Sequence, residues 1–206
     1  TQVTGVGRYK LIVDVYMGVT GTGGTTEFAH IGVAGDGVTV NQLFTPITGS
    51  GYFMAMTGEG GSSSDYRHST AGGGLTNSGD PSYLNSTNTT NATGDTYQSI
   101  FPNSQFPGSP GNGWATLEID ISNVLGGHIT YSLDGYQGSG MTPIIQTLLD
   151  GPTDGFASLG YGDIFTSVAN PFQSQFIVYD NLVVTPEPAS LALLGLGAVA
   201  VIRRRR

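Results

Sequence analysis

Cysteine is absent from this chain of 206 residues, and charged side chains are scarce. Without thiols, neither a disulfide bridge nor a thiolate nucleophile or metal ligand can form, which excludes a disulfide-stapled scaffold and a cysteine-dependent enzyme. Charged residues make up 11% of the chain, whereas globular proteins average about 25%. Glycine, with 33 residues, is abundant instead. This composition suits many short strands and turns under an uncharged polar surface, as on extracellular bacterial proteins.

Basic residues are few, and they are unevenly placed. Four of the seven are Arg203, Arg204, Arg205 and Arg206, so residues 1–185 hold three basic and fourteen acidic residues, a net charge of −11. A surface of this sign repels the phosphate backbone of DNA and RNA. We therefore expect no nucleic acid partner.

Long apolar runs are also missing, with one exception at residues 189–202. As a helix these 14 residues would span about 21 Å, against a bilayer hydrocarbon core of about 30 Å. Insertion then requires a thinned bilayer or arginines that reach toward the headgroups. Because clustered arginines stay on the cytoplasmic side, the run predicts a short transmembrane helix, inserted transiently, with the larger part of the chain outside the inner membrane. A buried core helix is the alternative, which four consecutive arginines disfavour.

The tail combines three parts in order: Pro186-Glu187-Pro188, the apolar run, and the cluster Arg203–Arg206. This order resembles the PEP-CTERM sorting signal of Gram-negative bacteria. The resemblance implies recognition by an exosortase, removal of residues 186–206 near Pro186–Pro188, and release or attachment at the cell surface. Family members typically begin with a signal peptide, so we expect that one preceded Thr1.

The two prolines of this motif have a direct structural consequence. Pro186 and Pro188 lack an amide hydrogen and favour extended backbone. We therefore expect the segment to join neither a strand nor a helix, which leaves an exposed stretch where a processing enzyme can cut.

Residues 1–185 have the pattern of one β-rich domain. From Tyr9 to Met17, apolar residues at odd positions alternate with mostly polar ones, as in a half-buried strand. Residues 58–113 are rich in Gly, Ser, Thr, Asn and Pro and predict a long loop region. Outside the tail only 141–149 are expected to form a short helical turn. Further strands are expected at 26–34, 37–44, 51–57, 114–122, 128–134, 156–161 and 174–184, with shorter ones near 65–68 and 95–100 and a hairpin turn at Gly126-Gly127.

Strands at this spacing with glycine-rich turns predict an all-β fold, an antiparallel β-sandwich. The stretches GWATLEIDIS (113–122) and ITYSLDG (129–135) resemble paired strands of laminin-G and concanavalin A-like jelly rolls. QFIVYDNLVV (175–184) is similar to the last strand of such domains in sorted surface proteins. The resemblance implies a jelly roll of two curved sheets, whose concave face often meets carbohydrate, followed by the short hydrophobic helix.

Glu118 and Asp120 are the strongest candidates for chemistry. Two residues apart on one strand, they share a face at a separation of roughly 6–7 Å, near the distance of about 5–5.5 Å that retaining glycosidases use. The stretch resembles the E-I-D-x-x-E strand of jelly-roll glucanases. However, Ser122-Asn123 stand where that family places its acid/base, so the general acid is missing and we predict that the protein is not an enzyme.

Aromatic residues offer a second possibility, because a sugar ring stacks its C–H face on an aromatic ring. Trp114, the single tryptophan, would form such a carbohydrate-binding site together with Glu118 and Asp120. Core packing explains Trp114 and Tyr131 equally well. Other tyrosines that could contribute are Tyr66, Tyr83 and Tyr97.

Metal-ligand spacing is absent from the three histidines, His30, His68 and His128. Aspartates could instead bind a structural Ca²⁺, although none forms an EF-hand ladder. Asp180, where the final strand is expected to turn inward, is the one candidate ligand that we name. No other cofactor is expected.

We therefore expect an exported structural or adhesive protein of the cell surface or extracellular matrix of a Gram-negative bacterium. Its partners would be the exosortase and matrix polysaccharide or other surface components. A non-catalytic carbohydrate-binding module is the alternative, and a jelly-roll glycoside hydrolase is the third possibility.

Overall fold

The computed structural model is all-β in the part of the chain that it describes, which excludes most of the loop region 58–113 and all of 187–206. Within the described residues no helix is long and apolar enough to cross a membrane. The described residues are 2–3, 8–19, 27–41, 49–58, 66–69, 81–82, 84, 110–121, 127–135, 140–163 and 175–186.

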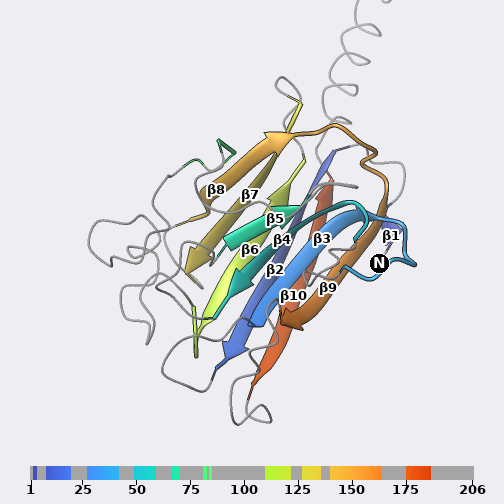
Figure 1. The fold of residues 1–206 in the computed structure, drawn as a ribbon. Helices are drawn as coiled ribbons and strands as arrows, with labels where there is room; N and C mark the ends of the chain where they lie inside the picture. Colours follow the sequence, from blue (N-terminus) through green and yellow to red (C-terminus); the bar gives the residue numbers. More distant parts are fainter. Residues whose placement is uncertain are drawn as a thin grey trace, which may run out of the picture.

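Ten strands in this part form two antiparallel sheets of five strands each (Figure 1). Sheet A has the order β1-β9-β3-β4-β5, and sheet B has the order β10-β2-β6-β7-β8. The bounds are Gln2–Val3 (β1), Tyr9–Gly18 (β2), Glu27–Gly35 (β3), Tyr52–Thr57 (β4), Tyr66–Ser69 (β5), Trp114–Asp120 (β6), His128–Gly135 (β7), Thr142–Leu148 (β8), Gly155–Asp163 (β9) and Phe176–Pro186 (β10).

The core lies between the two sheets and follows the alternation of the sequence. In β2 the residues Tyr9, Leu11, Val13 and Val15 are fully buried, while the residues between them are half-buried on the opposite face. Side chains from both sheets join one cluster with them, including Ile31 and Met54 of sheet A and Leu117 and Leu133 of sheet B. The prediction of an antiparallel β-sandwich is confirmed at this level.

Tyrosine hydroxyls at the edge of this core hold the connection between β8 and β9. The Tyr9 hydroxyl donates to the carbonyl oxygen of Thr153 at 3.0 Å. The Tyr52 hydroxyl accepts from the amide of Gly151 and donates to Asp150 Oδ1 at 3.4 Å. Both tyrosines are fully buried, so these bonds give their hydroxyl groups the hydrogen-bond partners that water would supply at the surface. Burial raises the pKa of Tyr9 to about 12.

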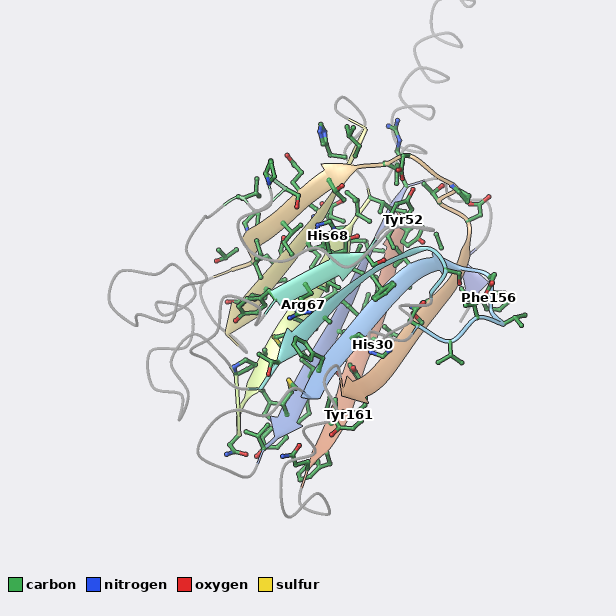
Figure 2. The ribbon with its side chains drawn as sticks, in the orientation of Figure 1. His30, Tyr52, Arg67, His68, Phe156 and Tyr161 are labelled. Carbon is green, nitrogen blue, oxygen red and sulfur yellow. The ribbon has the colours of Figure 1, made fainter. Side chains whose placement is uncertain are left out.

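Sheet A is buried on both of its faces around β4. Every residue of YFMAMT in β4 is buried, and a second apolar cluster of Phe28, Phe53 and Ala55 lies on the face away from sheet B. Arg67 of β5 is buried on this face and lies over the Phe28 ring, 5.6 Å from its centroid. Figure 2 labels Tyr52 on β4, His30 on β3 and both Arg67 and His68 on β5. Burial on both faces explains why β4 is a continuous apolar run without alternation.

Two predicted elements are wrong. The strand expected at 37–44 is absent at 37–41, and its residues 42–44 lie outside the described residues. Residues 37–39 form a bend, because Asp36 Oδ1 accepts from the amides of Val38 and Thr39 and closes a turn with Gly37 at φ +76°. The expected helical turn at 141–149 is strand β8. A bulge opposite Tyr131 and Ser132 lets Ile144 and Ile145 both be buried, so the apolar pair that looked helical belongs to a strand.

The remaining predicted strands are confirmed, and most of their ends agree with the observed ends within one or two residues. The strand predicted at 95–100 lies outside the described residues. The strand near 65–68 is β5. Gly127, at φ +60°, precedes β7 at the predicted hairpin turn, whose other glycine is not described. The predicted helix 189–202 also falls outside the described residues.

Candidate functional site

The outer face of sheet B, the face directed away from sheet A, brings together the three residues predicted to bind carbohydrate. Ala115, Leu117 and Ile119 of β6 belong to the core, so the residues between them point outward. The antiparallel register adds residues of β2, β7 and β10 to the same face. Its members include Lys10, Ile12, Asp14, Tyr16, Trp114, Thr116, Glu118, Asp120, Thr130, Ser132, Asp134, Phe176, Val178, Asp180 and Val183.

Three aromatic rings lie side by side at one end of this face, on β6, β2 and β10. The Tyr16 ring is 5.6 Å from that of Trp114 and 5.8 Å from that of Phe176, measured between centroids. Phe176 is 50% exposed and covers Gly18, where a Cβ would lie only 2.5 Å from the ring. We call Trp114, Tyr16 and Phe176 the aromatic row. It spans three neighbouring strands, each about 4.8 Å from the next.

Trp114 therefore lies outside the core cluster. Core packing does explain the predicted tyrosines that the structure describes. Tyr66 and Tyr131 are fully buried between the sheets. Tyr83 and Tyr97 lie outside the described residues.

Glu118 and Asp120 share a single ammonium group at the other end of the face. Lys10 Nζ lies 2.7 Å from Asp120 Oδ2 and 3.5 Å from Glu118 Oε2. Glu118 is only 7% exposed; burial raises its pKa, Lys10 opposes this rise and the charge of Asp120 adds to it. For Lys10, partial burial lowers the pKa, but the hydrogen bond to Asp120 and the two negative charges outweigh it, so the pKa is raised. The ammonium of Lys10 thus offsets only part of the effect of burial on Glu118, whose pKa is raised on balance.

Asp14 connects three strands in the middle of the face. Its Oδ1 accepts from the Thr116 hydroxyl at 2.6 Å, and its Oδ2 accepts from the Asn181 side-chain amide at 2.8 Å. Asn181 has φ +52° and follows Asp180, after which the pairing of β10 with β2 shifts by a bulge. A bulge is a common way to aim a side chain, here the Asn181 amide, at a neighbouring strand.

Asp180 is the predicted calcium ligand, and it points outward rather than inward. It is exposed, pairs with Asp14 across the strands, and accepts from the amide of Asn181 through Oδ1 at 2.8 Å. Among the described residues, no three His, Cys, Asp or Glu side chains are grouped to hold a metal ion. Calcium binding at Asp180 stays a prediction.

The three histidines lie apart from one another. His30 and His68 are buried on opposite faces of sheet A, and His128 is half-buried at the start of β7. His68 Nε2 lies 2.9 Å from the Ser82 hydroxyl. Burial lowers the pKa of His30 to about 4, so it is neutral at physiological pH.

Sequence reasoning missed Tyr16, Phe176, Lys10 and Asp14 as members of this face. The alternation of β2 contains the signal, because positions 10, 12, 14 and 16 face away from the core. What the sequence does not contain is the register that aligns Tyr16 with Trp114 and Lys10 with Asp120.

The expectation that the segment Pro186–Pro188 joins no strand is wrong at Pro186. It is the last residue of β10 and pairs with Tyr9 of β2. β10 is the outermost strand of sheet B in the described part of the chain, and an edge strand tolerates a missing amide donor on its open side. Glu187, Pro188 and Arg203–Arg206 fall outside the described residues.

Comparison with known proteins identifies one family model. Residues 184–206 match the PEP-CTERM protein-sorting motif. No curated protein matches the chain, and no solved structure matches it. The motif marks an exported, envelope-associated protein with an exosortase as its processing partner. The match begins inside β10, since residues 184–186 belong to both.

Proposed function

We propose that this chain, sorted through its PEP-CTERM motif, is a structural or adhesive component displayed on the surface or in the extracellular matrix of a Gram-negative bacterium. The observation that carries the proposal is the motif at 184–206, which continues directly from the last strand of a β-sandwich. In this arrangement the sandwich is the displayed part, and the exosortase removes the tail beyond a cut near Pro186–Pro188.

The tail works as a temporary anchor in this proposal. The sequence of residues 189–202 predicts a short helix, too short for stable residence in a bilayer, and the proposal keeps Arg203–Arg206 on the cytoplasmic side. The sandwich therefore lies beyond the inner membrane before cleavage. We take its two five-stranded antiparallel sheets to be a concanavalin A-like jelly roll.

Intact-mass analysis of protein isolated from its native host tests the sorting step. The expected mature chain ends near Pro186–Pro188. A mature chain that retains Arg203–Arg206 would contradict the proposal. For the structural role, purified mature protein is expected to sediment as filaments or sheets without an added ligand, or to coat a cell-envelope fraction. If it stays monomeric and binds no envelope material, the structural and adhesive role is wrong.

Carbohydrate binding without catalysis is the second candidate function, and the aromatic row favours it. Three rings on adjacent strands offer a stacking surface for neighbouring sugar units, and the carboxylates beyond it supply hydrogen-bond acceptors. Among the described residues named for this face, Lys10 is the one basic group beside five carboxylates, so neutral glycans fit better than anionic ones.

A glycan array tests this candidate. Trp114→Ala is expected to abolish a signal that the parent protein gives, while Tyr161→Ala, which removes an exposed ring of sheet A, keeps it. An equal signal from both variants contradicts the assignment to the aromatic row.

We also propose that the protein has no hydrolase activity. Lys10 bridges Glu118 and Asp120, and Ser122-Asn123 supply no acid in the position where jelly-roll glucanases have one. Turnover of a β-glucan that is lost in Glu118→Gln would overturn this and favour the glycosidase alternative.

A further inference from the structure

We infer that the folded strand β10 limits how far upstream the exosortase can cut. The sandwich holds the chain through Pro186, so the tail is released by a cut after Pro186 and the mature protein keeps the whole strand. The inference rests on the proposed sorting function and adds where, and against which surface, the processing enzyme must act.

The first half of β10 is fastened to both sheets. Ile177 and Tyr179 point inward and pack against the core. The Tyr179 hydroxyl crosses the sandwich to lie 3.0 Å from the carbonyl oxygen of His30 and 2.6 Å from that of Gly160. Residues 176–180 also pair in unbroken register with β2. This half cannot leave sheet B without breaking contacts to sheet A.

The second half, beyond the bulge, stays paired to its last residue. Val183, Val184, Thr185 and Pro186 are aligned with Ile12, Leu11, Lys10 and Tyr9 of β2, and Val184 packs against the core.

Tyr9, the residue opposite Pro186, is itself held firmly. Its ring is fully buried, its hydroxyl bonds to Thr153, and its carbonyl oxygen accepts from the amide of Ile121 at 3.1 Å. The strand thus ends opposite a residue that is fully buried in the core.

This arrangement sets the position of the cut. Proteolytic enzymes bind their substrates as extended, unpaired backbone, so a cut inside β10 first requires local opening of the strand and exposure of Val184. A cut after Pro186 requires no opening. Between Pro186 and the expected start of the helix at Ala189 lie two residues, so the chain from position 186 to position 189 spans at most about 11 Å. The exosortase must therefore reach a narrow stretch between the membrane and the end of the β2–β10 pair, beside Tyr9 and Lys10.

Two residues of β10 give a matched pair of variants. Val184→Asp places a charge on the inward side of the second half, whereas Val183→Asp places the same charge on a side chain that points outward and is 48% exposed. Full-length chains are produced with the exosortase in the native host, and the C-terminus is located by intact mass. The parent and Val183→Asp are expected to end at or after Pro186. Val184→Asp is expected to give additional ends upstream, between Asn181 and Thr185.

The possible outcomes distinguish a failure of this inference from a failure of the proposed function. A parent chain that keeps its arginine cluster contradicts the sorting function itself. A parent chain cut anywhere before Pro186 leaves the sorting function in place but overturns this inference. Identical ends for both variants also overturn it.

Limited proteolysis covers the case in which Val184→Asp does not fold. Full-length parent protein in detergent, treated with a protease of broad specificity, is expected to yield a resistant fragment that ends between Pro186 and Ala189. A resistant fragment that ends before Val184 overturns the inference without reference to the exosortase.

Discussion

The imidazole of His30 occupies the space that a side chain on Gly160 would need. The two residues pair across β3 and β9, and a Cβ at position 160 would overlap Nε2 of His30. The ring is only 5% exposed and lies beside Phe53, with 6.4 Å between ring centroids. A glycine in the middle of a strand usually weakens the strand. Packing explains Gly160, because a larger residue at this position would displace the His30 ring.

Gly160→Ala is therefore expected to lower the free energy of unfolding by about 1–3 kcal/mol, the usual cost of overpacking. Gly162→Ala is the matched control, because a Cβ two residues along β9 meets nothing within 4 Å. It should be neutral or slightly stabilising. Urea unfolding of both variants measures the difference, and equal stabilities would show that the His30 ring moves aside at no cost.

Tyr179→Phe removes the hydroxyl that joins β10 to the carbonyl oxygens of His30 and Gly160. Because the ring is largely buried, the two carbonyl groups lose a partner that water cannot readily replace, and we expect a loss of about 1–3 kcal/mol. Tyr16→Phe removes a hydroxyl from the half-exposed outer face of sheet B and should change stability by less than about 0.5 kcal/mol. Thermal or urea unfolding checks the pair, and the prediction fails if the two variants are equally stable.

Acid sensitivity is expected from His30. Burial lowers its pKa to about 4 from an ordinary value of 6.5, and its Nδ1 has no hydrogen-bond partner within the described part of the molecule. As the pH falls below 6.5 the unfolded chain binds a proton that the folded chain does not. Stability is therefore complete above pH 6.5 and declines toward pH 4, by about 3 kcal/mol from this residue.

His30→Gln, which cannot titrate, should have a flatter stability profile between these two limits. His128→Gln serves as the control, because it changes a half-buried histidine of β7. Urea unfolding above pH 6.5 and near pH 4 gives the two slopes. A His30→Gln variant that loses as much stability on acidification as the parent would assign the acid sensitivity to other groups.

Strand positions could be predicted where the sequence has a period of two. The alternation from Tyr9 to Met17 identifies β2 because one of its faces is core and the other is outer surface. At Ile144 and Ile145 the same reasoning fails, since a bulge breaks the period and buries both. In β4 the run YFMAMT was placed correctly, although burial on both faces, which removes alternation, was not foreseen.

The candidate site depended on pairing, which a single sequence does not contain. Glu118 and Asp120 could be assigned to one face from their spacing alone. Lys10, whose ammonium group contacts both, comes from a strand more than 100 residues away, and only the antiparallel register of β2 and β6 brings it there. Pro186 was misjudged for a similar reason: its effect depends on whether the strand lies at an edge, a property of the whole sheet.

Lys10→Met tests the charge balance of the outer face of sheet B. The change leaves Glu118, 7% exposed, beside Asp120 without the ammonium that both contact. Because the Lys10 side chain is 37% exposed and screened by solvent, we expect a loss of only about 1 kcal/mol at neutral pH. Burial raises the pKa of Glu118 and Lys10 opposes this, so the variant raises it further. The part of the loss that comes from Glu118 should disappear as the pH falls below 4.5, where Glu118 is protonated in both states, and Glu118→Gln in the same chain should recover that part at neutral pH. Urea unfolding at neutral pH and below pH 4.5 measures the loss. An equal loss at both pH values would assign it to the contact with Asp120 or to packing of the lysine stem.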